Sequence, residues 1–167
     1  MAIARNLVEA GAAEAARAIA LLLRKPTVPV RAIDVVDAEG LALRLAPRAL
    51  VVGFTVSGGV PGRFALAATE AHGNKLAQDL VGVSTRSAVD GLNKRALGAL
   101  TELGNIGASA YLNGLARALD TACVPSVPSL LVDDALVAVQ HALGNAREIS
   151  VATLEAGSFT IELCLTR

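Results

Sequence analysis

Hydrophobic and polar positions along the first half of the chain change their spacing several times. Apolar residues that recur every three or four positions indicate helices, whereas β-branched apolar runs bounded by Gly and Pro indicate strands. The first helical pattern ends at Lys25-Pro26, because the residue before a proline disfavours helical backbone. The expected elements are a helix at 4–24, an extended run at 27–36, a short segment at 37–46, the two strands of a hairpin at 49–56 and 63–68, and a helix at 70–81.

The second half repeats this order of patterns. Two local matches support a duplication: Leu7–Gly11 aligns with Leu100–Gly104, and Val36–Leu41 aligns with Val132–Val137. The segment from Gly82 to Asp90 is the expected connection between the halves. The elements expected in the second half are a helix at 93–119, a Pro-marked extended run at 124–132, a short helix at 133–143, and a hairpin of 146–154 with 158–166 that turns at Glu155-Ala156-Gly157.

These patterns predict an α+β fold of tandem pseudo-symmetric helix-strand-hairpin repeats. The repeats are expected to share one antiparallel sheet, with the two long helices packed on it, because each element must bury its apolar face against another. The length suits a single domain over residues 1–167, with a first half at about 1–82 and a second at about 91–167.

The composition of the chain excludes several classes of binding partner. Fifteen Lys and Arg balance fifteen Asp and Glu, and only 2 % of residues are aromatic. The chain therefore lacks the basic surface and the stacking platform expected of a nucleic-acid binder, and it lacks a polybasic face for membranes. No signal peptide and no long apolar run is present, which predicts a cytoplasmic protein without membrane insertion. Cys123 and Cys164 are expected to be buried, reduced thiols.

The long helix of the second half has two different faces on a helical wheel. Its predicted buried arc carries three glycines, which are expected to permit close approach of another backbone. That arc holds Leu100, Leu103, Gly104, Gly107, Ala110, Tyr111, Gly114, Leu115 and Ala118. The opposite arc holds Glu102, Asn105, Ser109 and Asn113, together with Leu112 and Ala116, and Ile106 lies at its flank. Glu102 and Asn105 are three residues apart and thus surface neighbours, which suits either a solvated face or a site.

Glu102-Leu103-Gly104-Asn105 matches the central part of a family motif, and residues 106–127 separate Asn105 from Pro128 as that motif requires. In these residues the chain resembles the CheC/CheX/FliY family of response-regulator phosphatases, and its CheC-like members in particular. The surrounding segments 103–108 and 125–128 are similar to the family as well, as is 62–66 at the start of the second hairpin strand. The resemblance also includes the two-half layout.

The chain departs from the family pattern at two places. The first motif position, Asp or Ser in the family, is Gly98, so one polar contact with a partner is missing or is supplied by Ser109 or Asn113. In the first half, Glu9 aligns with Glu102, but the Asn position is Ala12 and the Asp/Ser position is Arg5. The resemblance therefore implies one retained site and a degenerate first-half site. The residues expected to contact a partner are Gly98, Ser109, Leu112 and Asn113.

The resemblance implies a phosphatase that acts on the phospho-aspartate of a CheY-like response regulator in chemotaxis signalling. Asn105 would orient the attacking water, because a carboxamide offers both donors and an acceptor without a charge that phosphoryl oxygens repel. Glu102 would pair with a lysine of the regulator. Little covalent chemistry falls to the catalyst of a phosphoryl transfer. The chain would thus need no cofactor or metal of its own, with Mg²⁺ expected on the regulator.

Other interpretations remain open. A non-catalytic adaptor of the same fold would bind a response regulator or the receptor deamidase CheD. A flagellar switch component is a weaker alternative, because the chain as given lacks the additional C-terminal domain expected of FliY-type proteins. His72 and His141 lack partners at metal-binding spacing, and the run 57–62 lacks the Gly-Lys-Ser/Thr ending of a phosphate loop. Asp133 and Asp134 are expected to cap the helix that follows them.

Overall fold

The computed structural model describes residues 3–82 and 92–167. Its elements, in chain order, are α1 (Arg5–Leu22), β1 (Val30–Val36), α2 (Ala38–Leu45), β2 (Arg48–Gly58), β3 (Gly62–Thr69), α3 (Glu70–Val81), α4 (Lys94–Leu119), β4 (Cys123–Pro125), β5 (Ser129–Asp134), α5 (Ala135–Leu143), β6 (Ile149–Ala156) and β7 (Phe159–Thr166). The predicted helices and both hairpins are confirmed. The short segment at 37–46 is the helix α2, and the extended run at 124–132 is divided into β4 and β5. The expected connection lies, apart from Gly82, outside the described residues.

All seven strands belong to one antiparallel sheet, in the order β1-β6-β7-β3-β2-β4, with β5 also paired to β2. The α+β prediction with a shared antiparallel sheet is therefore confirmed. The first strand of each half pairs with the hairpin of the other half: β1 lies beside β6, and β5 lies beside β2. The two hairpins meet at the centre of the sheet through β3 and β7. The halves are thus interleaved.

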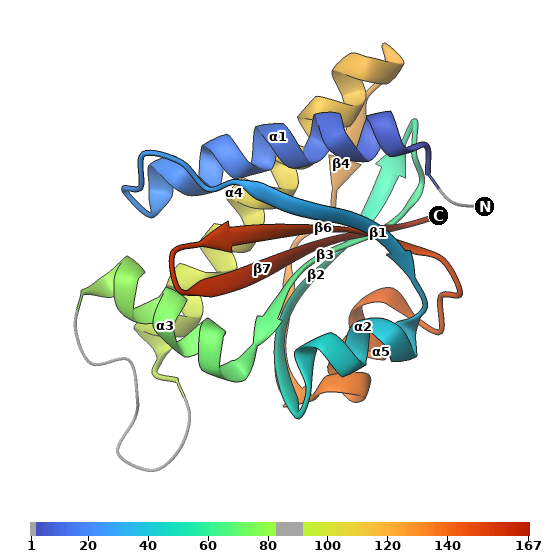
Figure 1. The fold of residues 1–167 in the computed structure, drawn as a ribbon. Coiled ribbons are helices and arrows are strands. Elements are labelled where there is room, and N and C mark those ends of the chain that lie inside the picture. Colours follow the sequence, from blue (N-terminus) through green and yellow to red (C-terminus); the bar gives the residue numbers. More distant parts are fainter. Residues whose placement is uncertain (1–2, 83–91) are drawn as a thin grey trace.

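Helices cover both faces of this sheet (Figure 1). The long helices α1 and α4 pack on one face, as predicted, and α2 and α5 pack together on the other. Side chains along β2 point alternately to the two faces of the sheet. Val52 and Phe54 belong to the core beneath α1 and α4, whereas Ala49 and Val51 belong to the core beneath α2 and α5. The outer side of α4 remains free for solvent.

Polar side chains at the helix N-termini mark where the helices begin. Asp37 of α2 accepts a hydrogen bond from the backbone N–H of Gly40 at 2.7 Å. Asp134 of α5 accepts from the N–H groups of Leu136 and Val137 at 3.0 and 3.3 Å, which confirms it as a cap. The equivalent of Asp37 is therefore Asp134. The predicted match of Val36–Leu41 with Val132–Val137 is wrong by one residue.

The two long helices approach each other closely at Gly114. A Cβ atom there would lie 2.7 Å from the carbonyl oxygen of Ala10 and 2.9 Å from the Cα of Gly11. The expectation that glycine permits backbone approach is therefore confirmed at Gly114. It is wrong at Gly104 and Gly107, where the nearest atoms belong to side chains of the sheet and of α1.

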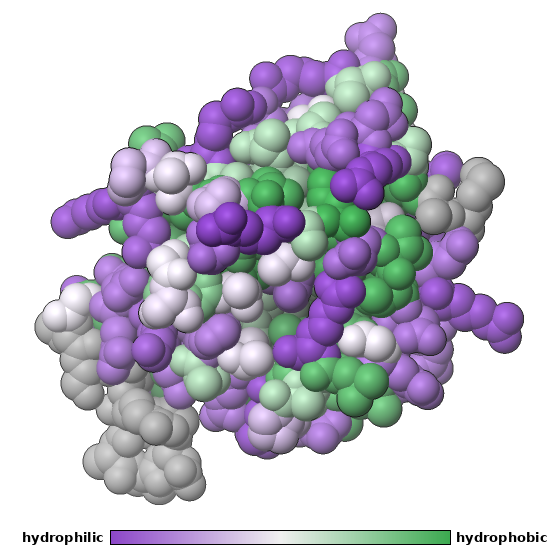
Figure 2. Space-filling view, viewed as in Figure 1, coloured by the Kyte–Doolittle hydropathy of each residue, from purple (hydrophilic) through white to green (hydrophobic). Residues whose placement is uncertain are grey.

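Hydrophobic surface is visible between α1 and α2, while hydrophilic side chains project around the outline of the molecule (Figure 2). The large hydrophobic residues that are exposed are Leu21, Val35, Leu43, Leu119, Val124, Val127 and Val137. Among the helices of the described residues, none has the length and apolar character needed to span a membrane. Cys123 and Cys164 are both buried and free, as predicted.

Glu162 of β7 is a buried carboxyl group and supports a prediction about pH. Its side chain accepts a hydrogen bond of 2.6 Å from the hydroxyl of Thr153, and only 7 % of the residue is exposed. Burial raises the pKa of Glu162, and the Thr153 hydrogen bond and nearby Arg44 oppose that shift only in part. Above this raised pKa the folded protein holds a desolvated charge. Glu162→Gln is therefore expected to increase the free energy of unfolding at about pH 8, and the gain should shrink as the pH falls toward the ordinary Glu pKa.

Urea denaturation of both proteins over a pH series measures this effect. Glu155→Gln on the neighbouring strand is the control, since it removes only an exposed ion pair with Arg31 and should be neutral or slightly destabilising. A Glu162→Gln protein that is less stable than the wild type at pH 8 would contradict the prediction.

Candidate functional site

The outer side of α4 presents a stripe of small and polar residues. Gly98, Glu102, Ser109 and Asn113 are exposed and Asn105 is half-buried. Successive members are separated by three or four residues, so they lie above one another along one side of the helix. The structure therefore brings together the polar residues that the helical wheel placed on one face. We call these five residues the α4 stripe.

Leu112 does not belong to this surface. It was expected to contact a partner, but its exposed fraction is 0 %, so that expectation is wrong. The buried face of α4 is rotated relative to the arc that the helical wheel predicts. Ala108 lies outside that arc but is buried, whereas Ala110 and Ala118 lie within it but are half-buried and exposed, respectively. The reason is that α4 packs on α1, on α3 and on strands of the sheet. Its buried face is therefore wider than the arc that the helical wheel gives.

Glu102 and Glu9 differ in whether their charge is already paired. Within residues 3–82 and 92–167, Glu102 forms no hydrogen bond and no ion pair. Glu9 of α1 accepts a hydrogen bond from Arg5 at 3.0 Å, one turn away on the same helix. Ala12, at the position that corresponds to Asn105, is completely buried. The first-half site thus has an exposed carboxylate that is already paired, and a buried alanine where the second half has a carboxamide.

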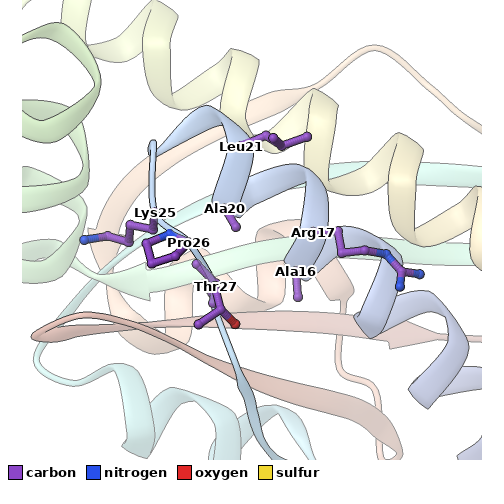
Figure 3. Close-up of a pocket in the computed structure, with 8 residues that line it drawn as sticks. Ala16, Arg17, Ala20, Leu21, Lys25, Pro26 and Thr27 are labelled. Carbon is purple, nitrogen blue, oxygen red and sulfur yellow. The ribbon is translucent and has the colours of Figure 1, made fainter.

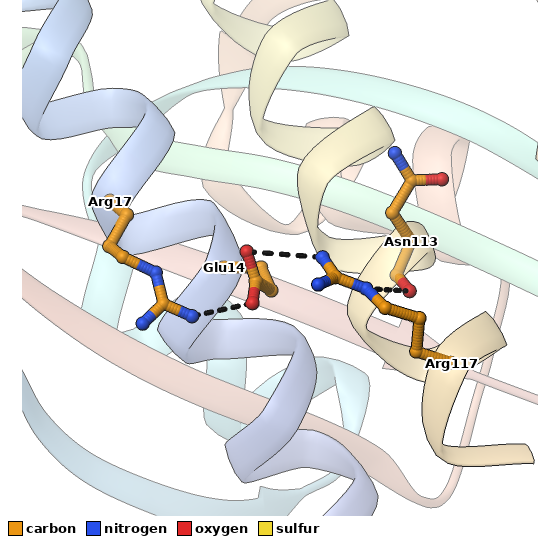
Figure 4. Close-up of polar contacts among 4 residues, drawn as sticks. All are labelled: Glu14, Arg17, Asn113 and Arg117. Atoms are coloured by element: carbon orange, nitrogen blue, oxygen red, sulfur yellow. Dashed lines mark hydrogen bonds and ion pairs between the residues drawn. The ribbon is translucent and has the colours of Figure 1, made fainter.

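Charged residues connect α1 to α4 beside the C-terminal end of the stripe (Figure 4). The carboxylate of Glu14 contacts Arg17 at 2.5 Å and Arg117 at 3.3 Å, and its pKa is lowered chiefly by the Arg17 hydrogen bond. Arg117 also donates to the backbone carbonyl of Asn113 at 3.4 Å, while the Asn113 side chain points away from it. Sequence reasoning missed this link, because Glu14 and Arg117 are far apart in the chain and only the helix packing joins them.

Pro128 lies between β4 and β5, where the chain shifts along the edge of the sheet. Ser126 holds this junction to β2: its N–H donates to the carbonyl of Thr55 at 2.8 Å, and its hydroxyl accepts from the N–H of Thr55 at 2.9 Å. Both strands contact α4. The proline of the motif therefore lies between two strands that both pack against α4.

Two hollows formed by the described residues lie away from the α4 stripe. One of about 330 Å³ is formed where Ala16 and Ala20 of α1 face the segment with Pro26 and Thr27 (Figure 3). Another, of about 350 Å³, lies between α2 and α5. Neither is lined by Glu102 or Asn105. In the part of the chain that the structure describes, no group of His, Cys, Asp and Glu side chains is placed to hold a metal ion. The α4 stripe is thus an exposed helix face that lies away from these two hollows.

Both histidines of the chain are placed by neighbouring polar groups. His72 of α3 accepts a hydrogen bond through Nδ1 from the backbone N–H of Thr160 at 3.2 Å and lies near the ring of Phe159. His141 of α5 lies 3.3 Å from the Ser129 hydroxyl through Nε2. The two histidines belong to different regions of the fold.

The comparisons with known proteins agree with the motif. Residues 96–132 match the family model described as the CheC-like family. This segment contains Glu102, Asn105 and Pro128, but the resemblance of 62–66 lies outside it. No curated protein is similar enough in sequence to this chain to count as a relative.

Several solved structures share the fold. Thermotoga maritima FliY is 15 % identical, with 99 % of this chain and 92 % of that chain covered and a TM-score of 0.69. A chain in the CheX–CheY complex of Borrelia burgdorferi with BeF₃ and Mg²⁺ is 15 % identical, with 95 % and 96 % covered and a TM-score of 0.65. A chain in the FliG–FliM complex of H. pylori is 12 % identical, with 98 % and 94 % covered and a TM-score of 0.64. The resemblance stated from the sequence is thus confirmed for residues 96–132, which match the CheC-like family model and contain Glu102, Asn105 and Pro128, and the fold is the one seen in FliY, CheX and FliM structures.

Proposed function

We propose that this protein dephosphorylates the phospho-aspartate of a CheY-like response regulator that docks on the α4 stripe. The observation that carries the proposal is the placement of Asn105 and an unpaired Glu102 next to each other on an open helix face. The CheC-like match over residues 96–132 supports it, as does the CheX–CheY complex among the structures with this fold.

In this proposal Asn105 positions the water that attacks phosphorus. Its side chain is half-buried, so part of its conformational freedom is already lost before the partner arrives. The carbonyl oxygen of the carboxamide accepts a hydrogen bond from one O–H of the water, so that a lone pair of the water oxygen can be directed at phosphorus. Phosphoryl transfer depends mainly on such positioning and on electrostatic stabilisation.

Glu102 would fix how the regulator is oriented. A carboxylate one turn from Asn105 can pair with a lysine beside the phosphorylation site of the partner. Because Glu102 has no partner within the described residues, no internal ion pair needs to be broken first. The chain would supply no metal, and Mg²⁺ would arrive bound to the regulator. Phosphate release from a phosphorylated receiver domain, with and without this protein, tests the proposal, and an unchanged rate would reject it.

A non-catalytic adaptor is the second candidate, and Gly98 is the observation that favours it. The family motif has Asp or Ser at this position, whereas this chain has a glycine, which offers no side chain for a polar contact. A FliM complex is among the structures with this fold, so the fold also serves assembly. An adaptor would bind a response regulator, or CheD, without accelerating loss of phosphate. The same phosphate-release assay, combined with a binding measurement, separates the two candidates.

Gly98→Ser is expected to increase turnover by about 2- to 10-fold, the effect of one added hydrogen bond to the partner. Among the described residues, and apart from the backbone of α4 itself, no atom lies within 4 Å of where its Cβ would be placed, so a serine fits without rearrangement. Gly98→Ala is the matched control, because it also adds a Cβ atom and improves helix propensity, by more than serine does, without adding a hydroxyl. Equal rates for the two variants would show that position 98 makes no polar contact.

Glu9→Ala is expected to change turnover by less than about twofold, since the Arg5 ion pair already occupies the carboxylate and exposed pairs contribute little. Phosphate-release kinetics with a single regulator measure this directly. A tenfold loss would show that the first-half site is functional.

A further inference from the structure

A polar hollow of about 280 Å³ lies on the sheet beyond the C-terminal end of α5. It is formed where the β2–β3 hairpin and the β4–β5 junction extend past that helix. More than half of its lining residues carry a hydrogen-bonding side chain, and none is acidic. The lining residues are Gly53, Phe54, Thr55, Arg63, Ser126, Val127, Ser129, His141 and Ala142.

The hollow opens on the side of the sheet opposite to α4. A Cβ atom on Gly53 would lie 3.0 Å from the Cβ of Ala142, so this side of β2 faces α5. Thr55 lies two residues further along the strand and therefore points to the same side, and Arg63 is its direct partner in the β2–β3 register. The hollow is thus distinct from the α4 stripe.

The charges around the hollow favour an anion. Arg63 is exposed and forms no hydrogen bond or ion pair with any residue of the described chain. His141 and Ser129 form a linked pair of polar groups, with 3.3 Å between Nε2 and the hydroxyl oxygen. The C-terminal end of α5 adds only about half a negative elementary charge. Arg63 carries a full positive charge, so the hollow remains positive.

We propose that this hollow binds a tetrahedral oxyanion of the phosphate type. Arg63 from β3, Ser129 from β5 and His141 from α5 approach the hollow from three elements, an arrangement that suits a tetrahedral group better than a planar carboxylate. The guanidinium provides paired N–H donors for two oxygens, and the Ser129 hydroxyl, when it accepts from Nε2 of His141, has its own O–H to donate to a third. The Ser126 hydroxyl already serves the backbone of Thr55 and is left out of this set.

Titration of the ¹⁵N-labelled full chain with inorganic phosphate, followed by amide NMR shifts, tests the proposal. We expect saturable shifts at Gly53, Thr55 and Ser129, with an apparent Kd in the millimolar range, and no comparable shifts at Glu102 or Asn105. Sodium chloride at matched ionic strength should not reproduce them, and sodium acetate should bind at least about threefold more weakly.

Arg63→Gln and His141→Gln are each expected to weaken phosphate binding, Arg63→Gln by about tenfold or more. Arg147→Gln is the matched control, because Arg147 lines another hollow, of about 240 Å³, that also contains Asp37 and Glu39. It should leave the phosphate shifts unchanged. Absence of saturable shifts, equal binding of acetate, or full binding by Arg63→Gln would each overturn the proposal, whatever the phosphatase assay shows.

Discussion

Replacing Asn105 with alanine is expected to slow dephosphorylation of the regulator by at least about a hundredfold, to near its spontaneous rate. The methyl group of alanine cannot hold a water in line with the phosphorus–oxygen bond. Because the side chain is only half-buried and lies on the outer face of α4, its loss should not disturb the core. Phosphate release measures the rate, and titration with a regulator carrying a phosphate mimic measures docking, which should remain largely intact.

Two further variants test whether the loss of activity is specific to the carboxamide of Asn105. Glu102→Ala should weaken both docking and turnover, since it removes the charge that would pair with the lysine of the partner. Gln140→Ala removes an exposed carboxamide from α5, on the other side of the sheet, and should change neither. An Asn105→Ala protein with full activity would reject the catalytic assignment, and unchanged docking by Glu102→Ala would reject the proposed orientation.

Gly114→Ala is expected to destabilise the fold by about 2 kcal/mol, which is the upper end of the usual cost of overpacking, about 3 kcal/mol, less the gain in helix propensity. The new Cβ would lie 2.7 Å from the Ala10 carbonyl oxygen and 2.9 Å from the Cα of Gly11, both of which belong to the backbone of α1. A flexible side chain could move aside, but a helix backbone cannot move without separating α1 from α4. Alanine improves helix propensity by only about 1 kcal/mol, which the overlap exceeds. Urea denaturation gives the free energy of unfolding.

Gly98→Ala on the same helix is the control for this measurement. Its Cβ enters open space, so the propensity gain should appear alone and increase stability by about 0.5–1 kcal/mol. If Gly114→Ala were as stable as the wild type, the close approach of the two helices would not be a constraint on the sequence.

Local patterns were sufficient for the elements and for the motif. Apolar spacing predicted every helix except α2, which was expected only as a short segment, and the run of Gly and Pro at 57–62 predicted a hairpin. Glu102 and Asn105 were expected on one helix face because they are three residues apart. Such features depend on neighbours within one or two turns, and the chain itself contains those neighbours. The cap at Asp134 was predictable for the same reason.

The interleaved sheet and the true buried arc of α4 depend on contacts between distant parts of the chain. Nothing local in Val30–Val36 indicates that it pairs with the hairpin of the other half, because an edge strand can satisfy its hydrogen bonds with any suitable partner. Leu112 is buried because sheet and α1 cover α4 from two directions, and a helical wheel contains neither. Helical periodicity thus determined that α4 would have a polar face, because the spacing of polar residues is a local property. The width of that face was determined by long-range packing. The structure also shows that Glu102 has no partner within the described chain, whereas Glu9 pairs with Arg5.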